Sequence, residues 1–174
     1  MNNSRMVVTV ALALMLSMMS AVPALAVTVS RIDGLPMDPA GEPFSAVGSL
    51  TLQRDALAAP CNVTLNGTIT TSGTVRVTSV TIPKKSGTNC LFFSSSASGV
   101  QPWTGQFDSA TQLTFNNATL SVPGVGSCGP SKLALNWTGA VNADPPTITF
   151  VNAVLEPSCK ITGTAAITPG LVVQ

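Results

Sequence analysis

One pattern of apolar and polar positions occurs four times along the chain, in residues 50–57, 75–82, 113–120 and 148–155. Positions 1, 3 and 8 are apolar in all four octets, and position 6 is apolar in three, with Asp55 in the first. Along a regular strand, positions 1 and 3 face one side of a sheet, and positions 6 and 8 face the other. The pattern therefore predicts four strands. Either a β-bulge turns both pairs toward one core, or both faces of each strand are buried.

Each octet is followed by a cysteine, four or eight residues after its last position. A new apolar stretch begins after each cysteine, as in residues 63–65 and 91–93, so the repeating unit is strand, short turn, cysteine, strand. Turn-forming residues recur about every ten positions, which is typical of all-β proteins. We predict an all-β fold, a single antiparallel β-sandwich or barrel of roughly eight strands, with the four cysteines near one rim.

The chain divides into three predicted segments. Residues 1–26 hold one cation, an apolar run and the small-residue site Ala24-Leu25-Ala26, which together predict a secretory signal peptide. Residues 27–45 are rich in Gly and Pro and are expected to form an extended lead-in. Residues 46–174 form the predicted β domain. We therefore expect a secreted protein that passes through the periplasm and acts outside the cell or at the cell surface.

The four cysteines, Cys61, Cys90, Cys128 and Cys159, are expected to form disulfides, because an even count in a secreted chain is typical of a disulfide framework. Three pairings are open. The nearly equal spacings favour Cys61 with Cys90 and Cys128 with Cys159, so that each bond closes one half of the repeat. The rival is a four-cysteine zinc site at the rim, although the chain has no Cys-x-x-Cys pair.

The composition argues against several classes of function. Charged residues make up 9% of the chain and the formal net charge is +1, which does not suit an electrostatic nucleic-acid binder. The chain has no His, the commonest general base and metal ligand. We find no catalytic triad, phosphate-binding loop or metal-ligand motif. The sequence therefore predicts no enzyme activity, no cofactor and no metal.

Apolar residues in Gly-, Ser- and Pro-rich segments are candidates for contact with another surface. Residues 91–93 are apolar on both faces, Trp103 follows a proline in a predicted loop, and Val125 lies in the third turn. Burial in the core is the alternative, since large apolar residues are usually inside. The hydrocarbon-contact candidates are Trp103, Phe92, Phe93 and Val125, with Trp103 first because its ring combines apolar area with a polar N–H.

Several motifs in residues 45–174 resemble the family called protein activator of alkane oxidation. They include 60–64 (Pro-Cys-Asn-Val-Thr), 101–103 (Gln-Pro-Trp), 126–130 (Gly-Ser-Cys-Gly-Pro) and 159–163 (Cys-Lys-Ile-Thr-Gly). The resemblance implies a small secreted protein of a pseudomonad or related Gram-negative bacterium, linked to growth on long n-alkanes by dispersing or presenting the hydrocarbon. It provides no catalytic residues to transfer.

We therefore expect a secreted, non-enzymatic activator of alkane oxidation that acts at the hydrocarbon–water interface. Its expected partner is a hydrocarbon or lipid surface and not nucleic acid, while self-association or a cell-surface partner stays open. The alternative is an extracellular structural protein of the cell surface, biofilm matrix or an appendage.

Overall fold

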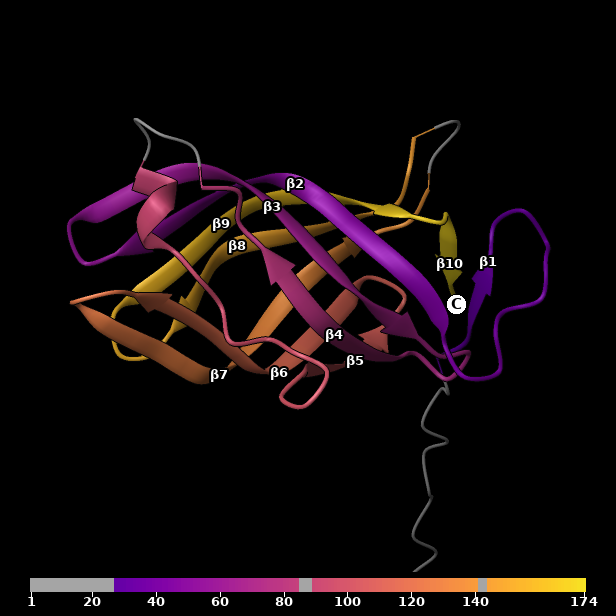
Figure 1. Ribbon diagram of the computed structural model, residues 1–174. Coiled ribbons are helices and arrows are strands. Elements are labelled where there is room, and N and C mark those ends of the chain that lie inside the picture. The colour runs from indigo at the N-terminus through magenta and orange to yellow at the C-terminus, as the bar shows by residue number, and fades with distance from the viewer. Residues whose placement is uncertain (1–26, 85–88, 141–143) are drawn as a thin grey trace, which may run out of the picture.

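Eight consecutive antiparallel strands close into a barrel (Figure 1). The computed structural model describes residues 27–84, 89–140 and 144–174, so the predicted signal peptide lies outside the described residues. The barrel strands are β2 (Glu42–Arg54), β3 (Leu57–Ile69), β4 (Thr74–Thr81), β5 (Trp103–Ser109), β6 (Gln112–Val122), β7 (Gly126–Thr138), β8 (Thr147–Leu155) and β9 (Cys159–Thr168). The predicted all-β architecture is confirmed, in its barrel form.

The barrel closes where β9 returns to β2. Ten residue pairs join these strands, from Ser45 opposite Thr168 to Arg54 opposite Cys159. Strand order around the barrel follows sequence order, so each of the other pairings joins neighbours in the chain. Successive strands therefore run in opposite directions, and every second connection lies at the same end.

Alternation along the strands fills the barrel interior with side chains. In β2, for example, Leu50 and Leu52 are buried while Ser49 and Thr51 are exposed. The apolar first, third and eighth octet positions of the second, third and fourth octets are all buried. A cavity inside the barrel, lined mainly by Leu, Val and Ile side chains, holds only about 10 Å³. The core is therefore closely packed.

Bulges account for the apolar pattern of three octets. In β6 the register shifts between Phe115 and Ala118, and in β8 it shifts between Phe150 and Ala153. The pairing of β4 with β3 also shifts by one residue, at Thr78. The inserted residue returns the later apolar positions of each octet to the interior. The bulge interpretation is thus confirmed for these strands.

The first octet is different. A two-residue turn, Asp55–Ala56, separates β2 from β3, so residues 50–57 are not one strand as predicted. Asp55 has a positive φ of 50°, which an aspartate in a tight turn tolerates better than an apolar residue. The polar residue at position 6 of this octet marks a reversal of the chain.

The connection between β4 and β5 also departs from the expected repeat. Residues 91–93 do not begin a strand: η1 (Asn89–Phe92), a single 3₁₀ turn, contains Cys90, and the next barrel strand begins only at Trp103. The segment between them follows β6 and contributes to the barrel wall, since Phe93 lies in the core and Ser95 lines the interior cavity. It makes one strand-like contact, a bridge between Ser94 and Ser121 of β6.

A small two-stranded sheet lies at the end of the molecule opposite η1 (Figure 1). It pairs β1 (Val29–Arg31) with β10 (Leu171–Val173). The expected lead-in, residues 27–45, thus contains β1 and the first four residues of β2. Within the described residues, no helix has the length and apolar character needed to cross a bilayer.

Candidate functional site

The four cysteines form two disulfides toward one end of the barrel. Cys61 pairs with Cys90 and Cys128 pairs with Cys159, with Cα–Cα distances of 5.6 and 6.0 Å. This confirms the favoured pairing. All four thiols of the chain are consumed, so the four-cysteine zinc site is wrong. Disulfides of this kind persist in oxidising compartments, which indicates an extracytoplasmic environment.

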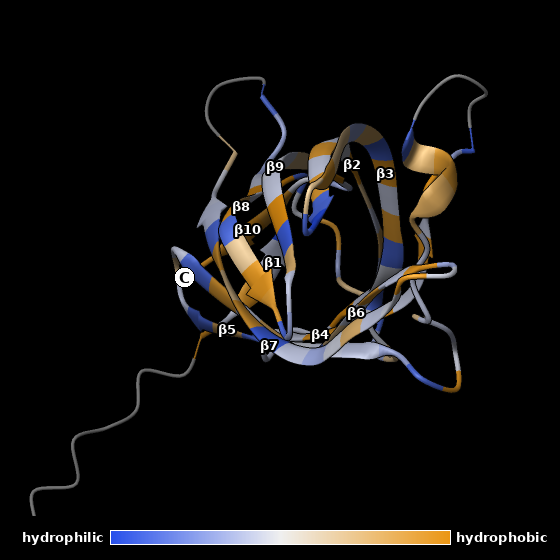
Figure 2. Ribbon diagram, turned by 90° about the vertical axis from the view of Figure 1, so that its left-hand side faces the viewer, coloured by the Kyte–Doolittle hydropathy of each residue, from blue (hydrophilic) through white to orange (hydrophobic). Residues whose placement is uncertain are grey.

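The Cys61–Cys90 bond fixes η1 against the barrel and determines which of its side chains face out. Cys90 is buried, and so is Phe93 three residues later, whose N–H donates to the Cys90 carbonyl over 3.2 Å. Residues three apart share one side of a 3₁₀ turn, so the two residues between them face solvent. Leu91 is 36% exposed and Phe92 is 48% exposed. Figure 2 shows η1 as an apolar segment on the outside of the barrel.

A third exposed apolar residue, Val125, lies on the turn between β6 and β7. The Ser94 and Ser121 backbones exchange two hydrogen bonds of 3.0 and 2.7 Å, which join the segment after η1 to the end of β6. Val125, at the tip of the turn that follows, is 55% exposed. We call Leu91, Phe92 and Val125 the rim surface. The structure places two of the four contact candidates, Phe92 and Val125, on it.

The other two candidates are core residues. Trp103 is 3% exposed and Phe93 is 1% exposed, so neither is available for contact with an external surface. Trp103 is the first residue of β5, packs against the Phe115 ring at a centroid distance of 6.2 Å, and donates from Nε1 to Thr119 Oγ1 over 3.4 Å. The expectation that Trp103 lies in an exposed loop is wrong. The alternation Trp103, Gly105, Phe107 is the signal that identifies it as an inward-facing strand residue.

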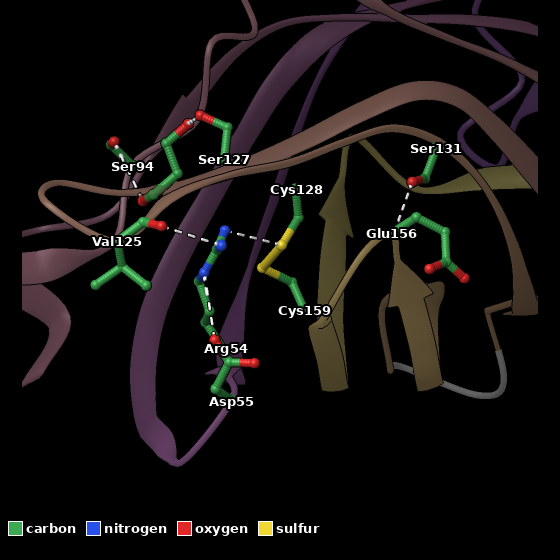
Figure 3. The surroundings of a disulfide bond; sticks show 10 residues. Arg54, Asp55, Ser94, Val125, Ser127, Cys128, Ser131, Glu156 and Cys159 are labelled. Carbon is green, nitrogen blue, oxygen red and sulfur yellow. Dashed lines mark hydrogen bonds and ion pairs between the residues drawn. A yellow bond between two sulfur atoms is a disulfide. The ribbon is translucent and has the colours of Figure 1, made fainter.

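A buried arginine crosses the barrel mouth beside the second disulfide (Figure 3). Arg54 continues the inward-facing series of β2, and its side chain is about 10% exposed. Its Nη1 donates to Cys128 Sγ over 3.3 Å and its Nη2 donates to the Val125 carbonyl over 3.2 Å. Asp55 Oδ2 lies 3.6 Å from Nε. The guanidinium thereby ties the turn that carries Val125 to the end of β2.

Neither Arg54 nor Leu91 is among the contact candidates predicted from the sequence. Arg54 was recognisable from its spacing, since Leu50, Leu52 and Arg54 are successive inward positions. Leu91 was included only in an apolar stretch, because no sequence signal separates the exposed Leu91 and Phe92 from the buried Phe93. The 3₁₀ turn that separates them depends on the disulfide at Cys90.

The opposite end of the barrel is charged. Arg31 of β1 forms ion pairs with Asp33 and with Glu42, the first inward-facing residue of β2. Its hydrogen bonds to Asp33 lower the pKa of that carboxyl from 3.8 to about 2, and the same contacts raise the pKa of the guanidinium. Both ends of the barrel therefore hold an ion-paired arginine, since Arg54 and Asp55 lie at the end that carries the rim surface.

A comparison with protein-family models gives a match over the whole chain. The model described as alkane oxidation protein activator PraA/PraB-like matches residues 1–174. The chain belongs to this family. Comparisons of the chain with curated proteins and with solved structures gave no match.

The site consists of exposed apolar side chains that covalent and hydrogen-bonded links hold in place. Across residues 27–84, 89–140 and 144–174, no group of three or more His, Cys, Asp or Glu side chains gathers as a metal site would require. The disulfides, the Ser94–Ser121 bridge and the Arg54 contacts all fix apolar side chains in outward positions.

Proposed function

We propose that the protein is a secreted, non-enzymatic activator of alkane oxidation that adsorbs at the hydrocarbon–water interface through the rim surface. The observation that carries the proposal is the outward position of Leu91 and Phe92, held there by the Cys61–Cys90 bond. Apolar side chains that water surrounds gain free energy on entering hydrocarbon, and an interface offers that transfer without unfolding. Membership of the activator family supports the link to alkanes.

The packed interior favours adsorption over transport of hydrocarbon inside the barrel. Buried apolar cavities that bind benzene are about 150 Å³ in size, whereas the cavity lined by Leu50, Leu65 and Phe150 holds about 10 Å³. An n-alkane therefore has to meet the outside of the protein. The rim surface is the candidate contact because it is fixed by covalent and hydrogen-bonded links.

The outer wall of the barrel suits the aqueous side of an interface. Ser49 of β2 lies opposite Asn62 of β3 and Thr164 of β9, and Thr51 lies opposite Thr162. These side chains point outward and carry hydroxyl or amide groups without charge. The molecule thus combines outward hydroxyl and amide groups on β2, β3 and β9 with three exposed apolar side chains at the rim, which is an amphiphilic arrangement.

The expected strength of adsorption is modest. Transfer of a half-exposed aliphatic or aromatic side chain into hydrocarbon contributes about 1 kcal/mol, given about 2 kcal/mol for complete burial. The three side chains together then contribute roughly 3 kcal/mol. Adsorption of this strength is reversible, so a molecule can leave a droplet and bind another.

The test compares two valines of equal exposure. Val125 is 55% exposed on the rim surface, and Val47 is 53% exposed on the barrel wall. We expect Val125→Ser and Phe92→Ser to lower the amount of protein bound to hexadecane droplets, and the control Val47→Ser to bind as the wild type does. Thermal unfolding of each variant shows that the fold is kept. Equal loss for Val47→Ser, or no loss for Phe92→Ser, would contradict adsorption through the rim.

An extracellular structural role is the second candidate, and one observation favours it. The outward-facing residues of β2 between Ser45 and Gln53 are uncharged, and the overall net charge is near zero, so copies of the chain repel one another little. A structural protein should remain in the insoluble extracellular matrix after washing with detergent. An interfacial activator should instead be recovered in the medium and in the hydrocarbon emulsion.

A further inference from the structure

A groove of about 520 Å³ lies on the outer wall of the barrel, between the segment that leads into β5 and the strands β6 and β7. It shares no residue with the rim surface. Val100, Pro102 and Pro130 form its apolar walls, and Val100 is 92% exposed. Ligand pockets in proteins are typically about 300–1,000 Å³, so the groove has the volume of a small-molecule site.

Hydrogen bonds shape the groove without a ligand. The Arg76 guanidinium donates from Nη2 to the Gly99 carbonyl over 2.6 Å, behind the tip that carries Val100. The Ser98 N–H donates to the Gln101 carbonyl over 3.1 Å, and the Gln101 N–H donates to Ser98 Oγ over 3.0 Å. A wall that is already ordered lowers the entropy cost of binding.

Polar groups at the base of the groove are already used within the protein. The Thr119 hydroxyl lies 2.8 Å from Ser96 Oγ, and it also accepts from the Ser96 N–H over 3.3 Å and from Trp103 Nε1 over 3.4 Å. These contacts close the wall between the groove and the barrel interior. A ligand in the groove therefore meets a sealed base and has to bind to the side chains around it.

Three uncharged polar side chains remain available to a ligand. Gln101, Thr104 and Asn117 line the groove. Their side-chain polar atoms have no hydrogen-bond partner among the protein groups that the structure describes. The Thr104 hydroxyl can donate and accept, and each amide offers both a carbonyl oxygen and an NH₂ group.

The two bulge asparagines of the barrel make Asn117 notable. Asn117 in β6 and Asn152 in β8 occupy equivalent positions, with φ values of 59° and 48°. Asn152 Oδ1 accepts a hydrogen bond from Thr162 Oγ1 over 3.0 Å. Asn117 lines the groove instead and has no such partner in the described part of the chain. The left-handed backbone explains an asparagine at both positions, but it does not explain why one amide faces a groove.

The geometry points to a binding site for the hydroxyl-bearing end of an uncharged amphiphile, with the hydroxyl bonded to Asn117, Thr104 or Gln101 and the aliphatic part against Val100 and the prolines. None of the lining residues is charged, and the cation beside the wall, Arg76, already donates to the Gly99 carbonyl, so an ionised head group would lose water without gaining a free counter-charge. A plain alkane would cover the amides without satisfying them. The groove should therefore prefer an alcohol or a sugar-headed lipid to an ionised amphiphile or a plain alkane. This inference does not depend on adsorption at the rim.

The experiment titrates the folded protein with four probes that share a chain of eight carbons: 1-octanol, octyl glucoside below its micelle concentration, octanoate, and octane up to its solubility limit in water. The readout is the NMR shift of the Asn117 and Gln101 side-chain amides. We expect saturable shifts with octanol, octyl glucoside or both, and weaker effects with octanoate and octane. Saturable shifts with octanol alone would identify a free alcohol as the ligand. Saturable shifts with octyl glucoside alone would identify a sugar head group.

Substitutions then locate the site. Asn117→Gly keeps the left-handed backbone while removing the amide, and Val100→Ser removes the aliphatic wall; Asn152→Gly is the matched control at the other bulge. Loss of one hydrogen bond should weaken binding roughly two- to tenfold, while the control should bind as the wild type does. Unchanged affinity in Asn117→Gly and Val100→Ser, equal affinity for octanoate or octane, or no saturable shift would overturn the inference. Droplet adsorption, which tests the rim surface, is scored separately on the same variants.

Discussion

Arg54 Nη1 donates a hydrogen bond to Cys128 Sγ over 3.3 Å, across the mouth of the barrel from β2 to β7. These two strands are not neighbours in the sheet. Cys159, the disulfide partner of Cys128, lies directly opposite Arg54 in the pairing of β2 with β9. One cation and one disulfide therefore hold three strands together at the rim.

Replacing Arg54 by alanine should lower the free energy of unfolding by about 2 kcal/mol, because hydrogen bonds from a charged group and the packing of its stem are lost together. Urea unfolding without reductant measures this. Arg54→Met keeps most of the stem and separates packing from hydrogen bonding. The control is Lys132→Ala, because Lys132 is an exposed residue of β7. It should change stability by less than about 0.5 kcal/mol. If Arg54→Ala changed the free energy of unfolding as little as the control does, the Arg54 side chain would not stabilise this end of the barrel.

Two aromatic residues near the same segment should respond in opposite ways. Trp103→Ala should lower the free energy of unfolding by about 3–5 kcal/mol, because it removes a buried ring from the core. Phe92→Ala should change stability by less than about 0.5 kcal/mol, since Phe92 is half exposed. Thermal and denaturant unfolding of both variants check the contrast. A stable Trp103→Ala variant would mean that the ring lies outside the core.

Removing the first disulfide should affect both stability and the rim surface. The Cys61–Cys90 bond joins residues 29 apart, and loss of a cross-link of this span costs roughly 3–4 kcal/mol in the loop-entropy model. The double variant Cys61→Ala/Cys90→Ala should also release η1. We expect weaker adsorption to hexadecane under conditions where the barrel is still folded. The matched variant Cys128→Ala/Cys159→Ala, with a separation of 31 residues, should lose similar stability and keep η1 in place.

Acid should weaken the end of the barrel opposite the rim. Arg31 holds the pKa of Asp33 at about 2, below the ordinary value of 3.8, so the unfolded chain takes up a proton at this residue before the folded chain does. The stabilisation from the Asp33 carboxylate is complete above about pH 4 and is lost as the pH falls through about 2. The stability difference between wild type and Asp33→Asn should shrink over that interval. An NMR titration of the Asp33 carboxyl that gives a midpoint near 3.8 would contradict this.

The strand architecture was predictable because its causes are local. The apolar side chains of the octets are buried in the core. The nearly equal spacing of the cysteines matches two halves of one barrel. The bulges were predictable for a geometric reason: positions 3 and 8 of an octet reach the same core only if one residue is inserted. The turn at Asp55 was missed because the same apolar spacing fits a hairpin as well as a bulged strand.

The rim surface was only partly predictable. Phe92 and Phe93 are identical residues side by side in the chain, and only the disulfide at Cys90 and the 3₁₀ turn decide which one faces solvent. Trp103 was misplaced because the preceding Gly, Ser and Pro residues resemble a loop, although its own alternation with Phe107 belongs to β5. The groove depends on a bulge in β6, a loop before β5 and Pro130 of β7, whose meeting no local pattern indicates.

Closure of the barrel by β9 and β2 affects how many copies can share one droplet. An unpaired strand edge is a template for pairing with another chain, and such pairing would join copies crowded on oil into one film. Here each barrel strand has a paired neighbour on both sides, although β7 and β8 share only three residue pairs, and the remaining sheet consists of two strands of only three residues. If the protein adsorbs as proposed, a dense monolayer should therefore stay fluid, with each molecule folded and free to desorb, so that the oil beneath the coat remains accessible to cells.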